Sequence, residues 1–200
     1  MVRVSFLPRL VVGALALLGL AGCRYQTPQM PRTDDWMMNE RWVADAMNRI
    51  ARAEHLWRAR DMDADGVLNF YVADLAFLEA QVGRRASPPF DVPEGLIRAD
   101  QGRFGAEAVP YHGYYFAAMT RNSEGVPYVN AQRFEFGFVA WPAAYRDGGV
   151  RTFVVNQDGH VWVRDHAGNP QIVWPEPDPE TRGWVPATYP GWSKAFPPEK

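Results

Sequence analysis

The sequence is poor in cysteine, in net charge and in long hydrophobic runs. Its 200 residues hold one cysteine, which excludes an internal disulfide and a cysteine-based zinc site. Basic and acidic residues nearly balance, 21 against 23, without a polybasic block, so we expect no nucleic-acid partner. No apolar run reaches the ~20 residues of a membrane-spanning helix. What is left is a chain of one-domain size whose 47% hydrophobic residues suffice for a packed core.

Motifs of several enzyme classes are also missing. No serine lies in Gly-x-Ser-x-Gly, and the glycines are scattered at turns instead of forming a phosphate-binding loop. His55, His112, His160 and His166 have no partner at metal-ligand spacing, so we interpret them as surface or edge histidines. We therefore expect that the protein is not an enzyme and has no catalytic residues. A hydrolase with an unrecognised site around His112, Asp158 or His160 stays an alternative.

The N-terminus is typical of a secretory signal peptide. Arg3 and Arg9 form a positive region, and residues 10–20 form an apolar stretch that ends in small residues. The sequence Leu20-Ala21-Gly22-Cys23 resembles the lipobox of bacterial lipoproteins, in which signal peptidase II cuts before the cysteine and the cysteine is lipidated. The resemblance implies a signal peptide over 1–22. An ordinary secreted protein with a chance cysteine is the alternative.

The same resemblance implies a location. Lipid on Cys23 would tether the protein to a membrane without spanning it. The residue after the cysteine is Arg24 rather than Asp. By resemblance to Gram-negative lipoproteins, this favours the outer membrane, with the body of the protein in the periplasm. Residues 23–33 lack apolar periodicity and contain two prolines, which is typical of a tether.

Residues 34–173 are expected to form one α+β domain that begins with a long helix. The helix is predicted from Asp34 or Asp35 to about Arg60, since apolar side chains recur at helical spacing: Val43, Met47, Ile50 and Trp57. Polar residues are expected mostly on the opposite face: Glu40, Asp45, Asn48, Arg49 and Arg52. A second short helix is predicted over 72–82. A long connection over 83–110 follows, anchored by Phe90, Leu96 and Ile97.

Beyond residue 112 the hydrophobic period changes to two. Strands are predicted over 113–120, 133–141, 152–156 and 160–164, the last two joined by a hairpin turn at Gln157-Asp158-Gly159. One set of side chains is expected on one face of its strand: Phe134, Phe136 and Phe138. A second set is expected to share the buried face: Phe153, Val155, Val161 and Val163. The sequence therefore predicts a helix packed on one face of a three- to four-stranded antiparallel sheet.

One long helix followed by antiparallel strands resembles the body of type IV pilins and type II secretion pseudopilins. The pilin N-terminal motif is missing, and a lipobox-like sequence stands in its place. A closer resemblance is carried by Gly113-Tyr-Tyr-Phe, by Gly137-Phe-Val-Ala-Trp-Pro-Ala-Ala-Tyr145 and by the run from Gly149 to Val161. It is to an uncharacterised family of bacterial secreted proteins, a domain of unknown function with a pilin-like outline. It implies a fold and no activity.

An acidic turn follows the predicted long helix. Asp61-x-Asp63-x-Asp65-Gly66 matches the first half of a calcium loop, with Asn69 at its ninth position. Val72 occupies the twelfth position, where an EF-hand has a bidentate Glu, so Asp74 or Glu79 would have to close the shell. We expect either weak calcium binding or a solvated acidic turn that ends the helix.

The C-terminal segment, residues 174–200, is rich in proline and tryptophan. Its 7 prolines exclude regular helix or sheet and predict an irregular strap. Trp184 and Trp192 are candidate binding residues for envelope polysaccharide or a partner protein. In the alternative, the aromatic side chains fold back and cover an exposed sheet edge.

These observations favour a non-enzymatic cell-envelope lipoprotein. Its expected role is structural, or the binding of an envelope protein partner. The alternatives are a module that binds envelope polysaccharide or calcium, and the hydrolase named above.

Overall fold

The computed structural model describes residues 36–71, 75–78, 94–128, 131–132, 134–175 and 179–187. The expected signal peptide, Cys23, the tether and Trp192 lie outside these residues. Among the helices described, none combines the length and the apolar character needed to cross a membrane.

The first helix, α1 (Trp36–Arg60), confirms the predicted one. It ends where Asp61 adopts a left-handed backbone conformation with φ 46°. Arg58 and Arg60 in its last turn interact favourably with the negative end of the helix dipole. The predicted apolar face is buried, but it also includes three residues that the sequence placed among the polar ones or left out: Glu40, Asn48 and Glu54.

The main sheet has five antiparallel strands in the order β2-β4-β5-β6-β7, which corrects the predicted count of three to four. Their bounds are β2 (Tyr114–Ala118), β4 (Gly137–Pro142), β5 (Arg151–Asn156), β6 (Val161–Asp165) and β7 (Val185–Pro186). The predicted hairpin is confirmed, with Phe153 opposite Val163 and Val155 opposite Val161. A second, two-stranded sheet pairs β1 (Phe70–Tyr71) with β3 (Ala131–Gln132).

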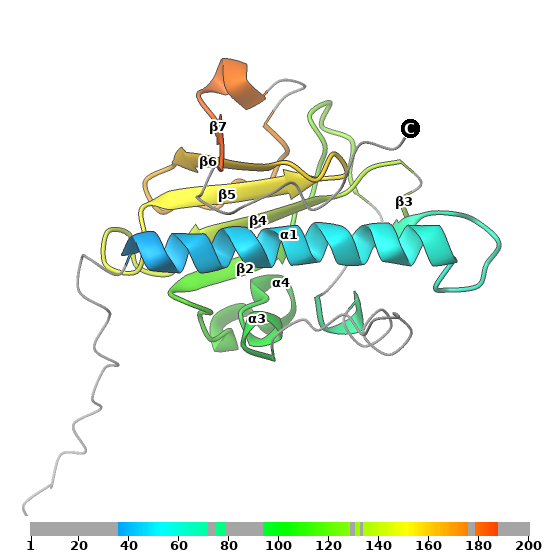
Figure 1. Ribbon diagram of the computed structural model, residues 1–200, viewed down its shortest axis with the longest axis horizontal. Helices are drawn as coiled ribbons and strands as arrows, with labels where there is room; N and C mark the ends of the chain where they lie inside the picture. The colour runs from blue at the N-terminus through cyan, green and yellow to red at the C-terminus, as the bar shows by residue number, and fades with distance from the viewer. Residues whose placement is uncertain are drawn as a thin grey trace, which may run out of the picture.

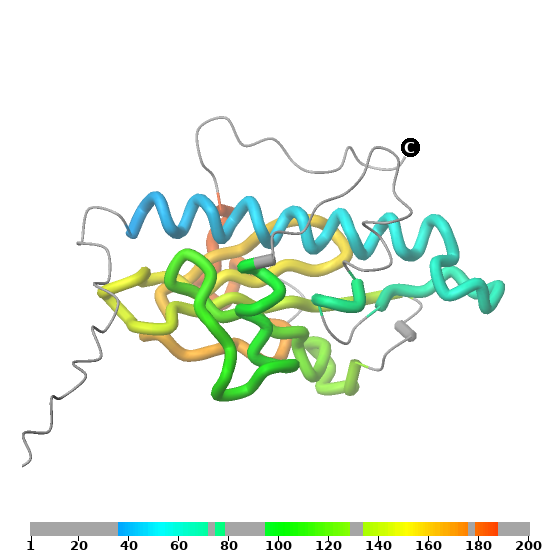
Figure 2. Tube along the Cα trace, turned by 90° about the horizontal axis from the view of Figure 1, so that it is seen from below, coloured from blue at the N-terminus to red at the C-terminus, as the bar shows by residue number. Residues whose placement is uncertain are grey.

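Helix α1 covers one face of the main sheet, so the domain has a helical layer over a β layer (Figures 1 and 2). The principal core lies between them and includes Ile50, Phe136, Phe153 and Val163, each at most 1% exposed. Residues 40 and 55 of α1 contact residues 151 and 157 of the β5 side. Fifteen helical residues span about 22 Å and six strand residues about 20 Å, so the helix follows β5 along its length.

The opposite face of the sheet is also buried, which corrects the prediction of a sheet covered on one face. All six residues of β4 are buried. The far side holds a second apolar cluster that consists of Met119, Val139, Trp141, Val154, Trp174 and Trp184. Its last two members come from the segment after β6, which packs back onto the sheet.

That segment also corrects the prediction that residues 174–200 exclude regular structure. It contains a 3-10 helix, η2 (Pro179–Arg182), and the short strand β7, which pairs with the edge of β6. Pro186 is compatible with a strand here because β7 is an edge, where a missing N–H leaves no ladder bond unmade.

Two further predictions need correction. Phe134 is 70% exposed, because β4 begins only at Gly137 and the alternation does not reach back to residue 134. The expected connection over 83–110 contains helices α3 (Glu94–Arg98), α4 (Gln101–Phe104) and η1 (Gly105–Glu107), with the Asp100 side chain capping α4. Leu96 is fully buried, as expected of an anchor, while Phe90 lies outside the described residues. Of the predicted helix over 72–82, residues 75–78 are described and are helical.

Candidate functional site

Asp61, Asp63 and Asp65 converge in the turn that follows α1. One carboxylate oxygen of each lies within 4.8 Å of the other two, and no other group of three potential His, Cys, Asp or Glu ligands gathers in the described part of the chain. The turn holds this shape through its own hydrogen bonds. The Gly66 N–H donates to Asp61 Oδ2 at 3.0 Å, and the Val67 N–H donates to Asp65 Oδ1 at 2.7 Å.

The turn is joined to the protein interior through Asn69, which is 3% exposed. The indole Nε1 of Trp57 donates to Asn69 Oδ1 at 3.3 Å, and Asn69 Nδ2 reaches Asp63 Oδ2 at 3.5 Å. The Asp61 Oδ1 atom is buried and accepts no hydrogen bond. An acidic cluster at the negative end of a helix dipole attracts a cation.

The donor set fits a hard cation such as Ca²⁺, which is bound through oxygen. With one converging oxygen each, the three carboxylates supply three of the 6–8 oxygens that Ca²⁺ takes. Val72, Asp74 and Glu79 lie outside the described residues. The arrangement therefore matches the predicted half of a calcium loop, whose part in the protein would be to fasten the end of α1 to the segment before β1.

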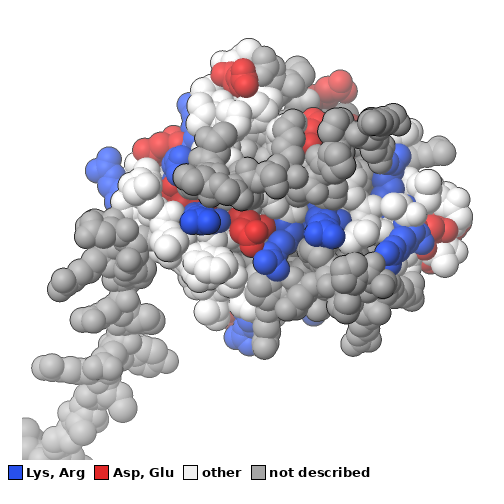
Figure 3. Space-filling view, viewed as in Figure 1, with Lys and Arg blue, Asp and Glu red and all other residues white. Residues whose placement is uncertain are grey.

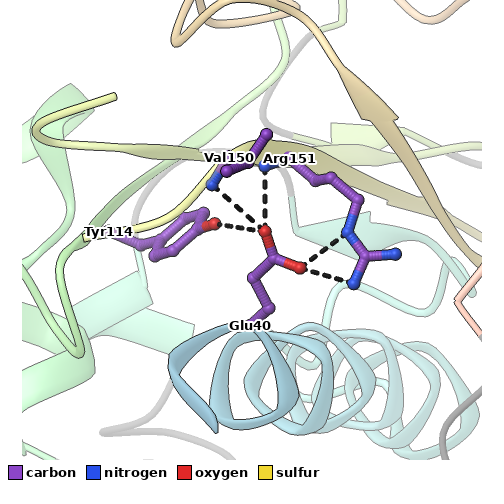
Figure 4. A network of polar contacts seen from close by, with 4 residues as sticks. All are labelled: Glu40, Tyr114, Val150 and Arg151. Atoms are coloured by element: carbon purple, nitrogen blue, oxygen red, sulfur yellow. Dashed lines mark hydrogen bonds and ion pairs between the residues drawn. The ribbon is translucent and has the colours of Figure 1, made fainter. Parts of the chain in front are cut away.

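A second polar site lies at the other end of α1 and was missed from the sequence. Glu40 is fully buried, and its Oε1 accepts three hydrogen bonds: from the Tyr114 hydroxyl at 3.3 Å, the Val150 N–H at 3.1 Å and the Arg151 N–H at 3.0 Å (Figure 4). Its Oε2 accepts from Arg151 Nε at 2.6 Å and forms an ion pair with a terminal guanidinium nitrogen of the same residue.

This geometry joins α1 to β2 and to the start of β5. The Tyr114 ring passes so close to Gly149 that a Cβ there would lie 2.0 Å from the hydroxyl oxygen, so a larger residue is excluded. Because every acceptor position of Glu40 that faces the protein is used, the carboxylate is compensated inside the domain and is not presented to a substrate. The role of this site is to hold α1 against the sheet.

Glu54 is the second carboxylate on the buried face of α1. It is fully buried, its Oε2 accepts the Tyr71 N–H at 2.8 Å, and its Oε1 has no partner. Burial raises the pKa of Glu54 well above the ordinary value of 4.5, and the single backbone hydrogen bond offsets only part of this effect. Burial therefore shifts the protonation equilibrium of Glu54 toward the neutral form in the folded protein.

A signal for Glu40 and Glu54 exists in the sequence. Positions 40, 43, 47, 50, 54 and 57 alternate steps of three and four, the spacing of one helix face. Both glutamates fall on it. The prediction that placed Glu40 on the polar face, and left Glu54 unassigned, overlooked that a carboxylate can be buried where the fold supplies donors.

The histidines do not come together. His55 Nε2 contacts the Gln157 carbonyl oxygen at 2.8 Å, and His166 Nδ1 contacts that of Asn169 at 3.1 Å. His112 precedes the start of β2, which pairs with the end of β4, whereas Asp158 and His160 follow β5 beside the start of β4. The five residue steps of β4 separate these places by about 17 Å. The residues considered for a hydrolase therefore lie at opposite ends of the sheet.

Trp184, the one candidate binding tryptophan within the described residues, is 2% exposed and packs in the far-side cluster. Little of its ring is available to a polysaccharide or a partner. This placement matches the alternative in which the aromatic side chains of the C-terminal segment cover the sheet.

Helix α1, with one face buried along a five-stranded antiparallel sheet, defines an α+β protein of the helix-on-sheet type. The chain belongs to the family described as "Protein of unknown function (DUF2950)", whose family model matches residues 37–173. This confirms the expected membership of an uncharacterised domain family. Among curated proteins and among solved structures, none matches the chain.

Proposed function

We propose that this protein is a lipoprotein of the bacterial cell envelope, anchored through lipid on Cys23 and held in the periplasm at the outer membrane. The proposal rests on one observation, the sequence Leu20-Ala21-Gly22-Cys23 at the end of a short apolar stretch that follows Arg3 and Arg9. A single thiol placed at such a cleavage point has a chemical use as an acceptor of lipid, and lipid with more than one acyl chain gives stable anchoring.

The role proposed for the body is structural, or the binding of an envelope protein, and not catalytic. The internal use of Glu40 and Arg151 and the separation of His112 from His160 support this role. The long helix laid on an antiparallel sheet also supports a pilin-like outline, in which a rigid head presents its surface to a partner.

Fatty-acid labelling in the producing bacterium tests the anchor. The wild-type chain should incorporate label, and Cys23→Ala should incorporate none and retain its signal peptide. Arg24→Ala is the matched control, because it changes the neighbouring residue and leaves the acceptor thiol in place. Label on Cys23→Ala would show that lipid is attached elsewhere, and an unlabelled wild-type chain would show that it is absent.

Partner binding is tested by cross-linking the lipidated protein in its own membranes, followed by purification. The proposal expects an envelope protein that is enriched with the wild-type chain. Recovery of the same proteins with an unrelated lipoprotein that carries the same N-terminal 33 residues would remove the proposed role of the body.

Calcium binding is the second candidate function, and it is favoured by the convergence of the Asp61, Asp63 and Asp65 oxygens. Without a twelfth-position Glu, a dissociation constant on the order of 10⁻⁴–10⁻³ M is expected, as in extracellular modules. Titration calorimetry of the full chain measures it, with Asp63→Asn as the variant and Asp147→Asn, an exposed carboxylate at the other end of the domain, as the control. Equal heats from both variants would exclude the turn as a site.

A further inference from the structure

The start of α1 exposes an unusual set of apolar side chains. Met37 is 61% exposed, Met38 56% and Trp42 47%, and these are the only large hydrophobic residues of α1 that are exposed. All three lie in the first two turns. Steps of three and four place them, together with the exposed Arg41, on the side of the helix that faces away from the sheet. We call Met37, Met38, Arg41 and Trp42 the helix-start patch.

Contacts with the rest of the domain position the patch. Trp42 stacks on His112 with ring centroids 5.2 Å apart and an interplanar angle of 8°. One turn of helix beneath it, Asn39 Nδ2 donates to the Gly148 carbonyl at 3.0 Å and Glu40 is fastened to Arg151. The exposed apolar groups therefore lie beside the contacts that join the start of α1 to the rest of the domain.

The position of the patch relative to the chain is informative. Only the 12 residues from Arg24 to Asp35 separate Cys23 from α1. A chain of that length reaches at most about 45 Å, and α1 itself is about 38 Å long. The helix-start patch is thus the apolar surface of the described domain that lies nearest, along the chain, to the proposed lipid.

The charge of this side of the molecule is complementary to anionic lipid. Helix α1 contains five arginines and three acidic residues, and two of the acidic residues, Glu40 and Glu54, are buried. Figure 3 shows basic side chains spread along the α1 side of the molecule. Tryptophan and other large apolar side chains beside arginine are typical of surfaces that lie in the interface of a membrane.

We propose that the helix-start patch docks on the lipid surface in which Cys23 is anchored, so that the α1 start of the domain faces the membrane and the β5–β6 turn faces away. The inference rests on the proposed lipid attachment. A short link to a second binding element gives an effective concentration in the millimolar range, so a patch with weak intrinsic affinity is sufficient. The lipid chain supplies attachment, and the patch supplies orientation.

Spin labelling of the full, lipidated chain in vesicles of phosphatidylethanolamine and phosphatidylglycerol tests this orientation. One label is placed at Met38→Cys and a matched one at Val126→Cys, an exposed apolar position in the turn after β2 at the opposite end of the sheet. The Met38→Cys label should collide several-fold less often with a water-soluble nickel reagent and more often with oxygen. The Val126→Cys label should remain fully accessible to the nickel reagent.

Two comparisons separate the possible failures. The wild-type chain should take up no spin label, because its cysteine carries lipid; uptake would contradict the anchor and this inference together. If the wild-type chain is unlabelled and the Met38→Cys label is as accessible to nickel as the Val126→Cys label, the orientation alone is wrong. Arg41→Glu, introduced beside Met38→Cys, should shift the label back toward water, since a carboxylate opposes anionic headgroups.

Discussion

Glu40 and Glu54 share one face of one helix and have different electrostatic situations. Glu40 faces a guanidinium, a hydroxyl and two backbone N–H groups, whereas Glu54 faces one backbone N–H and has one oxygen without a partner. The donors around Glu40 compensate its buried carboxylate, whereas burial with a single donor raises the pKa of Glu54. The first therefore fixes the helix to the sheet, and the second makes stability depend on pH.

Removing the partner of Glu40 should be costly. Arg151→Met leaves a buried carboxylate without its counter-charge, and we expect a loss of about 3 kcal/mol in the free energy of unfolding. Arg52→Met, at an exposed position of α1, should change the free energy of unfolding by less than about 0.5 kcal/mol. Urea unfolding of the two variants measures the difference. Equal midpoints would mean that the ion pair does not hold α1 to β5.

Glu54→Gln should remove a pH dependence. Because the folded pKa of Glu54 is raised, its contribution favours the folded state below the ordinary value of 4.5 and is lost as pH rises from there toward the folded pKa. The glutamine keeps an acceptor for the Tyr71 N–H. The stability of the variant relative to wild type should therefore increase as pH rises from below 4.5 to neutral, while Glu107→Gln, an exposed control, should give no trend. The measurement is the melting temperature of each protein as a function of pH. If the curve of Glu54→Gln runs parallel to that of wild type, the raised pKa of Glu54 is contradicted.

At the scale of elements, the spacing of hydrophobic residues along the sequence predicted most of the helices and strands of the core. Val43, Met47 and Ile50 predicted α1, and the Gln157-Asp158-Gly159 turn predicted the β5–β6 hairpin, because both depend on neighbours close in sequence. Contacts between distant segments carry no such period. The burial of Trp174 and Trp184 on the far face depends on the chain returning after β6, and the sequence does not encode that path locally.

The candidate site shows the same division. The Asp61-x-Asp63-x-Asp65 spacing predicted a turn whose oxygens converge, since all its ligands are local. The Glu40 network joins residues that are 111 positions apart, and only the register of β2 and β5 brings them together. Sequence spacing places Glu40 on the buried face of a helix; it does not reveal Arg151 as its partner.

The packing of α1 on the sheet is tested by truncating side chains on both sides of the contact. Ile50→Ala and Phe153→Ala should each cost about 2–5 kcal/mol, because both side chains are fully buried in the shared core. Phe134→Ala is the control, since that ring is 70% exposed. Thermal melts of the three variants that coincide with wild type would show that α1 does not pack on this sheet.

At the scale of the whole molecule, the described features divide along α1. The helix-start patch and the Glu40 network lie at the end where the chain enters, and the acidic turn lies beyond Arg60, about 38 Å away along the helix. Under the proposed attachment, the first end faces lipid and the second extends into the periplasm. An envelope partner would then meet the acidic turn and the nearby loops before it meets the membrane.

The central claim is the lipid on Cys23, and mass spectrometry of the N-terminal peptide of the native, membrane-extracted protein tests it most directly. We predict a mature chain that begins at Cys23 and carries the mass of a diacylglyceryl group, with a further acyl chain on its amino group. A native chain that begins at any other residue, or an N-terminal peptide with a free Cys23 thiol, would contradict the account.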